Sequence, residues 1–134
     1  MTMVRTLYSD QWGDILDRPE DDCVEIRWFD TSTDMSGDDF NEFLGTYAGH
    51  VEVCGRRGAL VDAVQFRMDF AKMSLGWRDE NIIPRYNAAG VKKFAFLLPA
   101  GVPPITNDPA PEGPADFPTG NFDSLEKALA WIKG

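Results

Sequence analysis

Two apolar runs decide the fold of this chain: Ala59-Leu60-Val61-Asp62-Ala63-Val64 and Val91-Lys92-Lys93-Phe94-Ala95-Phe96-Leu97-Leu98-Pro99. One helix-length segment, residues 65–90, separates them. This pattern is typical of a β-α-β crossover, in which the strands 59–64 and 92–98 run parallel in one sheet. Parallel sheets carry helices on their faces and bind ligands at the carboxyl ends of their strands. The sequence therefore predicts an architecture and a place for a site, but it names no reaction.

The segments before the crossover predict a β-hairpin and a helix. Strands over 13–18 and 23–29 surround the turn Pro19-Glu20-Asp21-Asp22. Ser36 and Asp39 have the spacing of a capping box, which marks a helix start. One apolar stripe at helical spacing follows, formed by Phe40, Phe43, Leu44 and Tyr47. Gly55 or Gly58 should end this helix.

The later segments predict a broken crossover helix, a long loop and a closing helix. Pro84 predicts a kink or two short helices, which Gly90 ends. Residues 99–120 hold seven of the nine prolines and show neither helical nor strand periodicity, so we expect a functional lid or a disordered loop. Asp123-Ser124-Leu125-Glu126 is a second candidate capping box. Its helix has a buried stripe of Leu125, Ala128, Leu129 and Ile132, with Trp131 beside it.

Length and composition indicate one domain covering residues 1–134. The chain has 134 residues, of which 43% are hydrophobic, and it is long enough to bury a core without disulfides or metal ions. We expect a single small α/β domain, with a mixed, mostly parallel sheet flanked by helices and an N-terminal β-hairpin. No apolar run reaches the length of a membrane span, and the N-terminus lacks the apolar core of a signal peptide. A cytoplasmic location is therefore expected.

The negative charge is concentrated in the N-terminal third. The net charge is −9, and residues 1–42 carry 12 acidic side chains against 3 basic ones. Such a field repels phosphate backbones and anionic headgroups, so neither nucleic acid nor a membrane surface is expected as a partner. The acidic residues indicate either a solvated surface that aids solubility or a docking surface for a basic protein partner.

Cysteine and histidine are too few for a metal site. Cys23 and Cys54 should be reduced thiols in a cytosolic chain, and the single histidine, His50, excludes a His-rich centre. His50 and Cys54 are four residues apart and could touch on a helix, but nothing in the sequence orients the imidazole. No metal, cofactor or catalytic residue is predicted.

The order hairpin, helix, strand, helix, strand, short strand, helix resembles the SpoIIAA-like family, which is related to STAS domains and to lipid-transfer folds of the CRAL-TRIO type. The resemblance rests on the runs 59–63 and 94–97 and on the closing segment 122–132, whose Phe-Asp, Glu, Ala, Trp and Ile positions are similar to the family's ending. It implies a STAS-like fold and a role in regulation or ligand carriage, without an active site. In anti-sigma-factor antagonists a serine just after an Asp is phosphorylated. Here no residue with a hydroxyl group directly follows Asp69, and Ser74 lies further along the chain. The family's phosphorylation switch is therefore not expected in this chain.

The densest polar cluster is Trp77-Arg78-Asp79-Glu80-Asn81, with Arg85 nearby. On a helix, Arg78 and Arg85 are seven residues apart and share a face, where they could bind a carboxylate or phosphate bidentately. A solvated helix with intrahelical pairs, such as Asn81 with Arg85, is the alternative.

A second candidate region follows the two parallel strands. Arg67 and Asp69 come after the first strand and Pro99 after the second, so they should converge at one edge of the sheet. The proline-rich loop could cover this edge, with Phe117, Trp77 and Met73 as an apolar wall. The candidate binding residues, for a small apolar or anionic ligand, are therefore Arg67, Asp69, Trp77, Arg78, Arg85 and Phe117. An Arg67–Asp69 pair that only fixes the turn is the alternative.

Three functional hypotheses follow. The first is a non-catalytic cytoplasmic module of STAS-like fold that regulates or binds a ligand. The second is a small enzyme whose anionic substrate is held by Arg67, Arg78 or Arg85, with Asp69 or Asp62 as base; Asp62 is also explained as a hydrogen-bonded carboxylate at a strand end. The third is a purely structural or dimerising protein whose interface, in a homodimer for example, is the acidic N-terminal surface or the edge strand of the hairpin.

Overall fold

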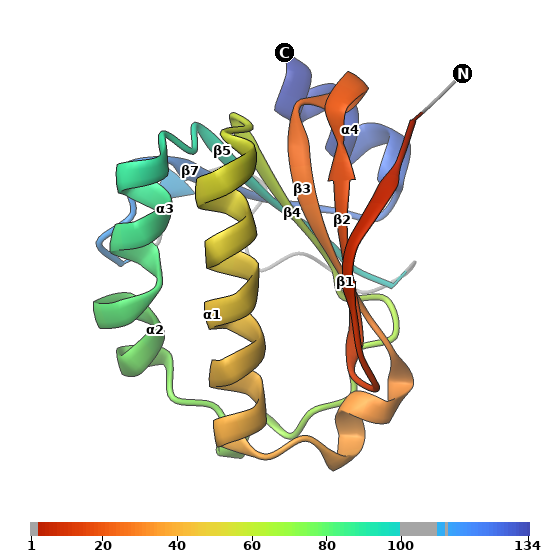
Figure 1. Cartoon of the computed structure of the whole chain (residues 1–134), viewed down its shortest axis with the longest axis vertical. Coiled ribbons are helices and arrows are strands. Elements are labelled where there is room, and N and C mark those ends of the chain that lie inside the picture. Colours follow the sequence, from red (N-terminus) through yellow and green to blue (C-terminus); the bar gives the residue numbers. More distant parts are fainter. Residues whose placement is uncertain (1–2, 100–109, 112) are drawn as a thin grey trace.

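The computed structural model describes residues 3–99, 110–111 and 113–134. A seven-stranded sheet of order β1-β2-β3-β4-β5-β7-β6 forms its centre (Figure 1). The strands are β1 (Arg5–Ser9), β2 (Gly13–Arg18), β3 (Cys23–Trp28), β4 (Gly58–Asp62), β5 (Lys93–Leu97), β6 (Ala110–Pro111) and β7 (Pro118–Phe122). The α-helices are α1 (Gly37–Cys54), α2 (Leu75–Asn81), α3 (Ile83–Ala89) and α4 (Leu125–Lys133). Short 3-10 helices are η1 (Pro19–Asp21), η2 (Asp30–Asp34) and η3 (Phe70–Lys72).

The predicted crossover is confirmed. β4 and β5 are neighbours and run parallel, with Leu60 opposite Ala95. β3 pairs parallel to β4, and β5 pairs parallel to β7. The remaining pairs, β1–β2, β2–β3 and β6–β7, are antiparallel. The sheet is therefore mixed, with its parallel strands in the middle, and the chain has the predicted α/β architecture.

The predicted hairpin is confirmed as β2–β3, but β2 does not form the edge of the sheet. β1 pairs antiparallel to β2, with an irregular register between Thr6 and Tyr8. The prediction that the hairpin supplies an edge strand is therefore wrong. β1 was not predicted from the sequence, because it is mostly exposed and lacks the alternation of a half-buried strand.

The predicted signals around the first two helical segments are confirmed. The Ser36 side chain accepts a hydrogen bond from the Asp39 amide, and the Asp39 carboxylate accepts one from the Ser36 amide. Helix α1 ends at Gly55, which has the left-handed φ of 65° that favours glycine. The crossover splits at Ile82 into the two short helices α2 and α3, with Pro84 in the first turn of α3.

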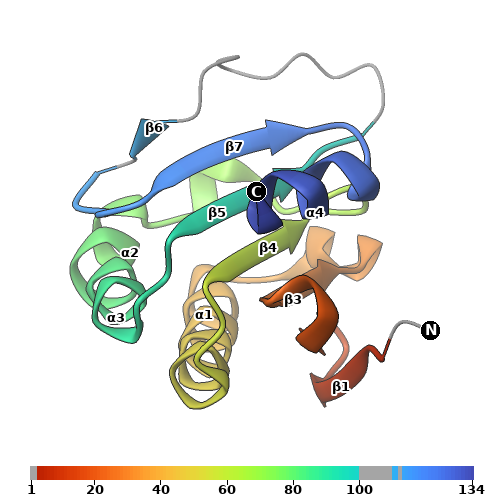
Figure 2. The ribbon, with the colours of Figure 1, turned by 90° about the horizontal axis from the view of Figure 1, so that it is seen from above.

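The helices α1, α2 and α3 lie on one face of the sheet and α4 lies on the other (Figure 2). The crossovers β3-α1-β4 and β4-α2-α3-β5 advance across the sheet in one direction. With the usual right-handed crossover, both place their helices on the same face. Alternation along each strand then divides the core: Val61 belongs to the cluster under α1, and its neighbour Leu60 belongs to the cluster under α4.

The C-terminal region differs from the sequence expectation in two respects. β7 begins at Pro118, inside the stretch 99–120 that shows no strand periodicity, and the expected short strand before the closing helix had no residues assigned to it. Its pairing to β5 is a backbone contact that its Pro-Thr-Gly-Asn sequence does not reveal. Helix α4 is capped by Ser124, which accepts a hydrogen bond from the Lys127 amide, so the capping residue lies one position after the predicted Asp123. Half of the predicted lid, residues 100–109 and 112, lies outside the described residues.

Candidate functional site

A cavity of about 350 Å³ lies between the sheet and the helices α1, α2 and α3. Trp28, Ala63 and Leu98 line it at or just beyond the carboxyl ends of β3, β4 and β5. Small-molecule sites commonly have volumes of about 300–1,000 Å³. The cavity therefore lies where parallel α/β sheets bind ligands, and its size suits a small molecule.

The walls of the cavity are almost entirely apolar. Six aromatic side chains contribute: Trp28, Phe40, Phe66, Tyr86, Phe94 and Phe96. Aliphatic and thioether groups complete the walls: Ile26, Leu44, Val61, Ala63, Met73, Ile83 and Leu98. Several rings pack on one another, with centroid separations of 5.7 Å for Trp28–Phe40, 5.2 Å for Trp28–Phe66 and 5.1 Å for Phe94–Phe96. Such walls favour an apolar ligand.

Arg78 is the one charged residue among the described residues that line this cavity, and Asn121 of β7 adds an amide. Arg78 Nη2 lies 3.7 Å from Asp79 Oδ1. Burial raises the pKa of Tyr86, and the positive charges of Arg78 and Arg85 oppose that rise. The positive charge of Arg78 therefore acts on Tyr86, which also lines the cavity.

Three of the predicted binding residues lie in or beside this region. Arg78 lines the cavity, and Met73, which the sequence analysis placed in an apolar wall, also lines it. Trp77 is partly buried against the same core cluster. Phe117 is 2% exposed and lines a much smaller adjoining hollow that shares Arg78.

The other predicted binding residues make contacts elsewhere. The Arg67 Nη1 atom donates to the Val64 carbonyl at 3.1 Å, and the Asp69 carboxylate accepts from the Ala71 amide at 3.0 Å. Both contacts stabilise the local turn. Arg85 lies against α1, where its Nη2 atom is 2.5 Å from Glu52 Oε1, and this ion pair lowers the pKa of Glu52.

These contacts separate the three arginines of the enzyme hypothesis. Arg78 faces the cavity, Arg67 faces its own turn, and Arg85 faces α1. Asp62, one of the two suggested bases, accepts a hydrogen bond from the Val64 amide and lies 3.8 Å from Arg27. This is the hydrogen-bonded role at a strand end that the sequence analysis gave as the alternative for Asp62.

The aromatic residues of the cavity wall are the part of the site that sequence reasoning missed. Phe40 was assigned only to the core, while Trp28, Phe66, Phe94 and Phe96 received no role in a site. One signal could have found two of them: alternation along β5 places Phe94 and Phe96 together on the face opposite Ala95. That face is the one that the crossover helices cover.

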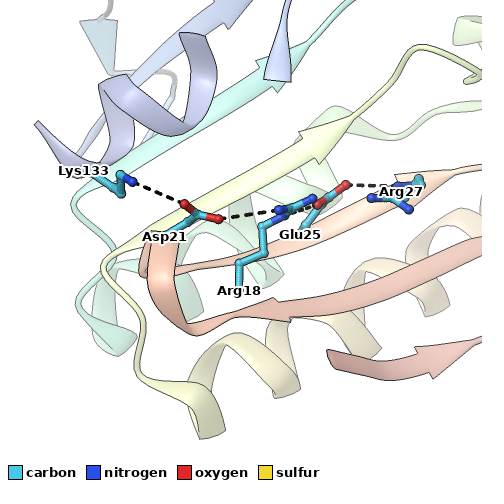
Figure 3. A network of polar contacts seen from close by, with 5 residues as sticks. All are labelled: Arg18, Asp21, Glu25, Arg27 and Lys133. Atoms are coloured by element: carbon cyan, nitrogen blue, oxygen red, sulfur yellow. Dashed lines mark hydrogen bonds and ion pairs between the residues drawn. The ribbon is translucent and has the colours of Figure 1, made fainter. Parts of the chain in front are cut away.

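A chain of ion pairs crosses the opposite face of the sheet (Figure 3). Lys133 of α4 contacts Asp21 at 3.4 Å, and Arg18 contacts Asp21 at 3.5 Å. The Glu25 carboxylate, which is fully buried, lies between Arg18 at 2.5 Å and Arg27 at 3.3 Å. Each buried charge thus has an opposite partner, and the network joins the hairpin to α4.

Neither cysteine has the properties of a nucleophile. Burial raises the pKa of Cys23 to about 12 and also raises the pKa of Cys54. A reactive thiol needs a lowered pKa, because the thiolate is the attacking form. Within the described ranges, no group of three or more His, Cys, Asp or Glu side chains is arranged to hold a metal ion.

Comparisons with known proteins do not extend this picture. No protein-family model, no curated protein and no solved structure matches the chain. Over residues 3–99, 110–111 and 113–134, every helix is too short or too polar to cross a membrane.

Proposed function

We propose that this domain is a ligand-binding module that holds a small, mainly apolar molecule between the sheet and helices α1, α2 and α3. One observation carries the proposal: a cavity of about 350 Å³ in a chain of 134 residues. Ligand pockets in proteins commonly have volumes of about 300–1,000 Å³ and mostly apolar walls. A hollow of this size at the carboxyl ends of parallel strands therefore supports a binding role.

The volume and the walls limit the ligand. Liquid water takes about 30 Å³ per molecule, so the cavity has the volume of about a dozen water molecules. Each Å² of apolar ligand surface that leaves water contributes about 25 cal/mol, before the costs of association. A compact apolar molecule suits this cavity better than a sugar or a free nucleotide.

The biological role that we propose is regulation or ligand carriage by a cytoplasmic, non-catalytic module, as the resemblance to STAS-like domains implies. The contacts of the alternative catalytic groups support this choice. Asp62 and Asp69 accept hydrogen bonds from nearby backbone amides, and Arg85 is held by Glu52. The raised pKa of Cys54 likewise opposes a nucleophilic role.

A matched pair of variants tests the binding role. Val61 lines the cavity, whereas Val53 of α1 is 85% exposed. We expect the native protein to bind the neutral fluorescent probe N-phenyl-1-naphthylamine, because the probe transfers from water to an apolar cavity. Val61→Phe should weaken this binding because it places four more carbon atoms in the cavity, and Val53→Phe should leave it unchanged. Absence of probe binding by the native protein, or equal binding by Val61→Phe, would overturn the proposal.

A further inference from the structure

We infer that the ligand of this cavity is a neutral, compact molecule with a carbonyl oxygen that accepts a hydrogen bond from the Tyr86 hydroxyl. This inference rests on the proposed function and specifies the class of ligand. It draws on two buried polar groups of the cavity wall that have no hydrogen-bond partner among the described residues.

The first step compares the three tyrosines of the chain. The Tyr8 hydroxyl donates to Asp10 Oδ2 at 2.8 Å. The Tyr47 hydroxyl donates to the Val24 carbonyl at 2.7 Å. Tyr86 is 2% exposed and lines the cavity, and its hydroxyl makes no hydrogen bond with any described residue. Buried tyrosine hydroxyls usually have a partner, because a polar group that loses its water without one is unfavourable. The Tyr86 hydroxyl is therefore the group that a ligand can satisfy.

The second step concerns the state of this hydroxyl. Burial raises the pKa of Tyr86 above its ordinary value of 10.0, so the hydroxyl keeps its proton at neutral pH and can donate it to an acceptor. The Tyr86 ring is packed between its neighbours, with centroid separations of 5.9 Å to Tyr47 and 5.7 Å to Phe94. These contacts hold the ring without help from its hydroxyl. The donor is therefore fixed before a ligand arrives, which lowers the cost of binding.

The third step decides between an acceptor and a donor on the ligand. Trp28 is 3% exposed and lines the same cavity, and its indole N–H donates to no described residue. An indole N–H can only donate, whereas a tyrosine hydroxyl can donate or accept. A ligand that suits both Trp28 and Tyr86 therefore carries an acceptor, and a carbonyl oxygen has two lone pairs for this purpose.

The fourth step concerns the charge of the ligand. Arg78 is the one charged residue among the described lining residues, and the Asp79 carboxylate, 3.7 Å away, offsets its charge. Asn121, the remaining polar residue of the described wall, is neutral. A charged ligand would lose its hydration in this apolar cavity, and the described wall offers no unpaired opposite charge to replace it. A neutral ligand therefore suits the cavity.

Three probes that share one ring system test the inference. In 1-tetralone the ring carries a carbonyl group, in tetralin a methylene group takes its place, and tetralin-1-carboxylate carries a negative charge. Dissociation constants are measured by displacement of N-phenyl-1-naphthylamine. Tyr86→Phe removes the hydroxyl and keeps the ring. It should weaken the binding of 1-tetralone about two- to tenfold, the range of one neutral hydrogen bond, and leave that of tetralin unchanged. The native protein should bind the carboxylate more weakly than 1-tetralone.

Tyr8→Phe is the matched control, because it makes the same chemical change at a tyrosine that is not among the described residues lining the cavity. It should bind all three probes as the native protein does. Urea denaturation adds a second readout. The urea midpoint of Tyr86→Phe should equal that of the native protein, because its hydroxyl has no hydrogen bond to lose. Tyr47→Phe, which loses the bond to Val24, should unfold at lower urea. An equal fall in Tyr86→Phe would reveal a structural partner of the Tyr86 hydroxyl and overturn the inference.

The other outcomes separate this inference from the proposed function. If Tyr86→Phe binds 1-tetralone as tightly as the native protein, or weakens 1-tetralone and tetralin equally, the hydrogen bond to the ligand is wrong and the binding module stands. Tighter binding of the carboxylate than of 1-tetralone would overturn the neutral ligand. If N-phenyl-1-naphthylamine binds but none of the three probes displaces it, only the inference fails. If N-phenyl-1-naphthylamine itself does not bind, the proposed function fails as well.

Discussion

On the face covered by α1, α2 and α3, six aromatic side chains surround a cavity of about 350 Å³. The face covered by α4 holds an apolar cluster and a chain of paired charges that includes the fully buried Glu25. The strands are shared, so the difference comes from the side chains that alternate along them and from the helices above. The cavity lies under α1 and the broken pair α2 and α3, whereas α4 covers an apolar cluster beside an ion-pair network.

The largest expected effect comes from breaking the network on the α4 face. Glu25→Gln removes the carboxylate that lies between Arg18 and Arg27. Arg18 is buried, so its charge loses its closest partner, and we expect a loss of about 3–5 kcal/mol in the free energy of unfolding. Urea denaturation measures this loss.

The control for this prediction is Glu20→Gln, which changes an exposed glutamate of η1 in the same way. A surface change of this kind should alter stability by no more than about 0.5 kcal/mol. If Glu25→Gln lowered the free energy of unfolding no more than the control does, the buried network would not stabilise the fold.

The second prediction compares one substitution on both faces. Ala95→Leu inserts three carbon atoms into the cluster under α4, where Ala95 is fully buried, and overpacking of this kind costs about 1–3 kcal/mol. Ala63→Leu places the same atoms in the cavity and should cost less than about 1 kcal/mol. The free energies of unfolding of both variants test the difference, and equal costs would contradict the contrast between the faces.

The third prediction concerns a polar contact on the cavity side. The Tyr47 hydroxyl donates to the Val24 carbonyl at 2.7 Å, and burial raises the pKa of Tyr47 well above its ordinary value of 10.0. Tyr47→Phe should cost about 1 kcal/mol at neutral pH, because the carbonyl loses its donor. This cost is smaller than that of breaking the ion-pair network.

The same tyrosine predicts an alkaline loss of stability. In the unfolded chain Tyr47 loses its proton near pH 10, while in the folded chain it keeps the proton to a higher pH. The unfolded state then binds fewer protons, so stability is complete below pH 10 and falls as the pH rises above it. Urea midpoints measured on both sides of this pH should differ less in Tyr47→Phe than in the native protein. An equal fall in both proteins would contradict the assignment to Tyr47.

The sheet could be predicted from sequence wherever a strand is both buried and apolar. β4 and β5 are such strands, and their parallel pairing followed from the helix-length segment between them, whereas the register, with Leu60 opposite Ala95, was not predicted. β1 and β7 could not be predicted in this way. β1 is an exposed edge strand, and β7 contains Pro118 and Gly120, so both depend on backbone pairing with a neighbour that is not evident from their own side chains.

The candidate site divides in a similar way. Its position at the carboxyl ends of β4 and β5 followed from the parallel topology, and Arg78 was among the predicted residues. Its walls did not follow, because Trp28 and Phe40 are distant in sequence from Phe94 and line the same cavity only through tertiary packing. Arg85 has the same sequence signal as Arg78, yet a glutamate on α1 holds it, and that contact is a property of the packed helices.

Chemical shifts of methyl groups on the two faces test the central claim most directly. In the protein labelled with ¹³C at its methyl groups and titrated with 1-naphthaleneacetamide, we expect the resonances of Leu44, Val61 and Ile83, which line the cavity, to shift with added ligand. Those of Leu60 and Ile132, in the cluster under α4, should remain in place. Shifts confined to Leu60 and Ile132, or of equal size on both faces, would contradict the account.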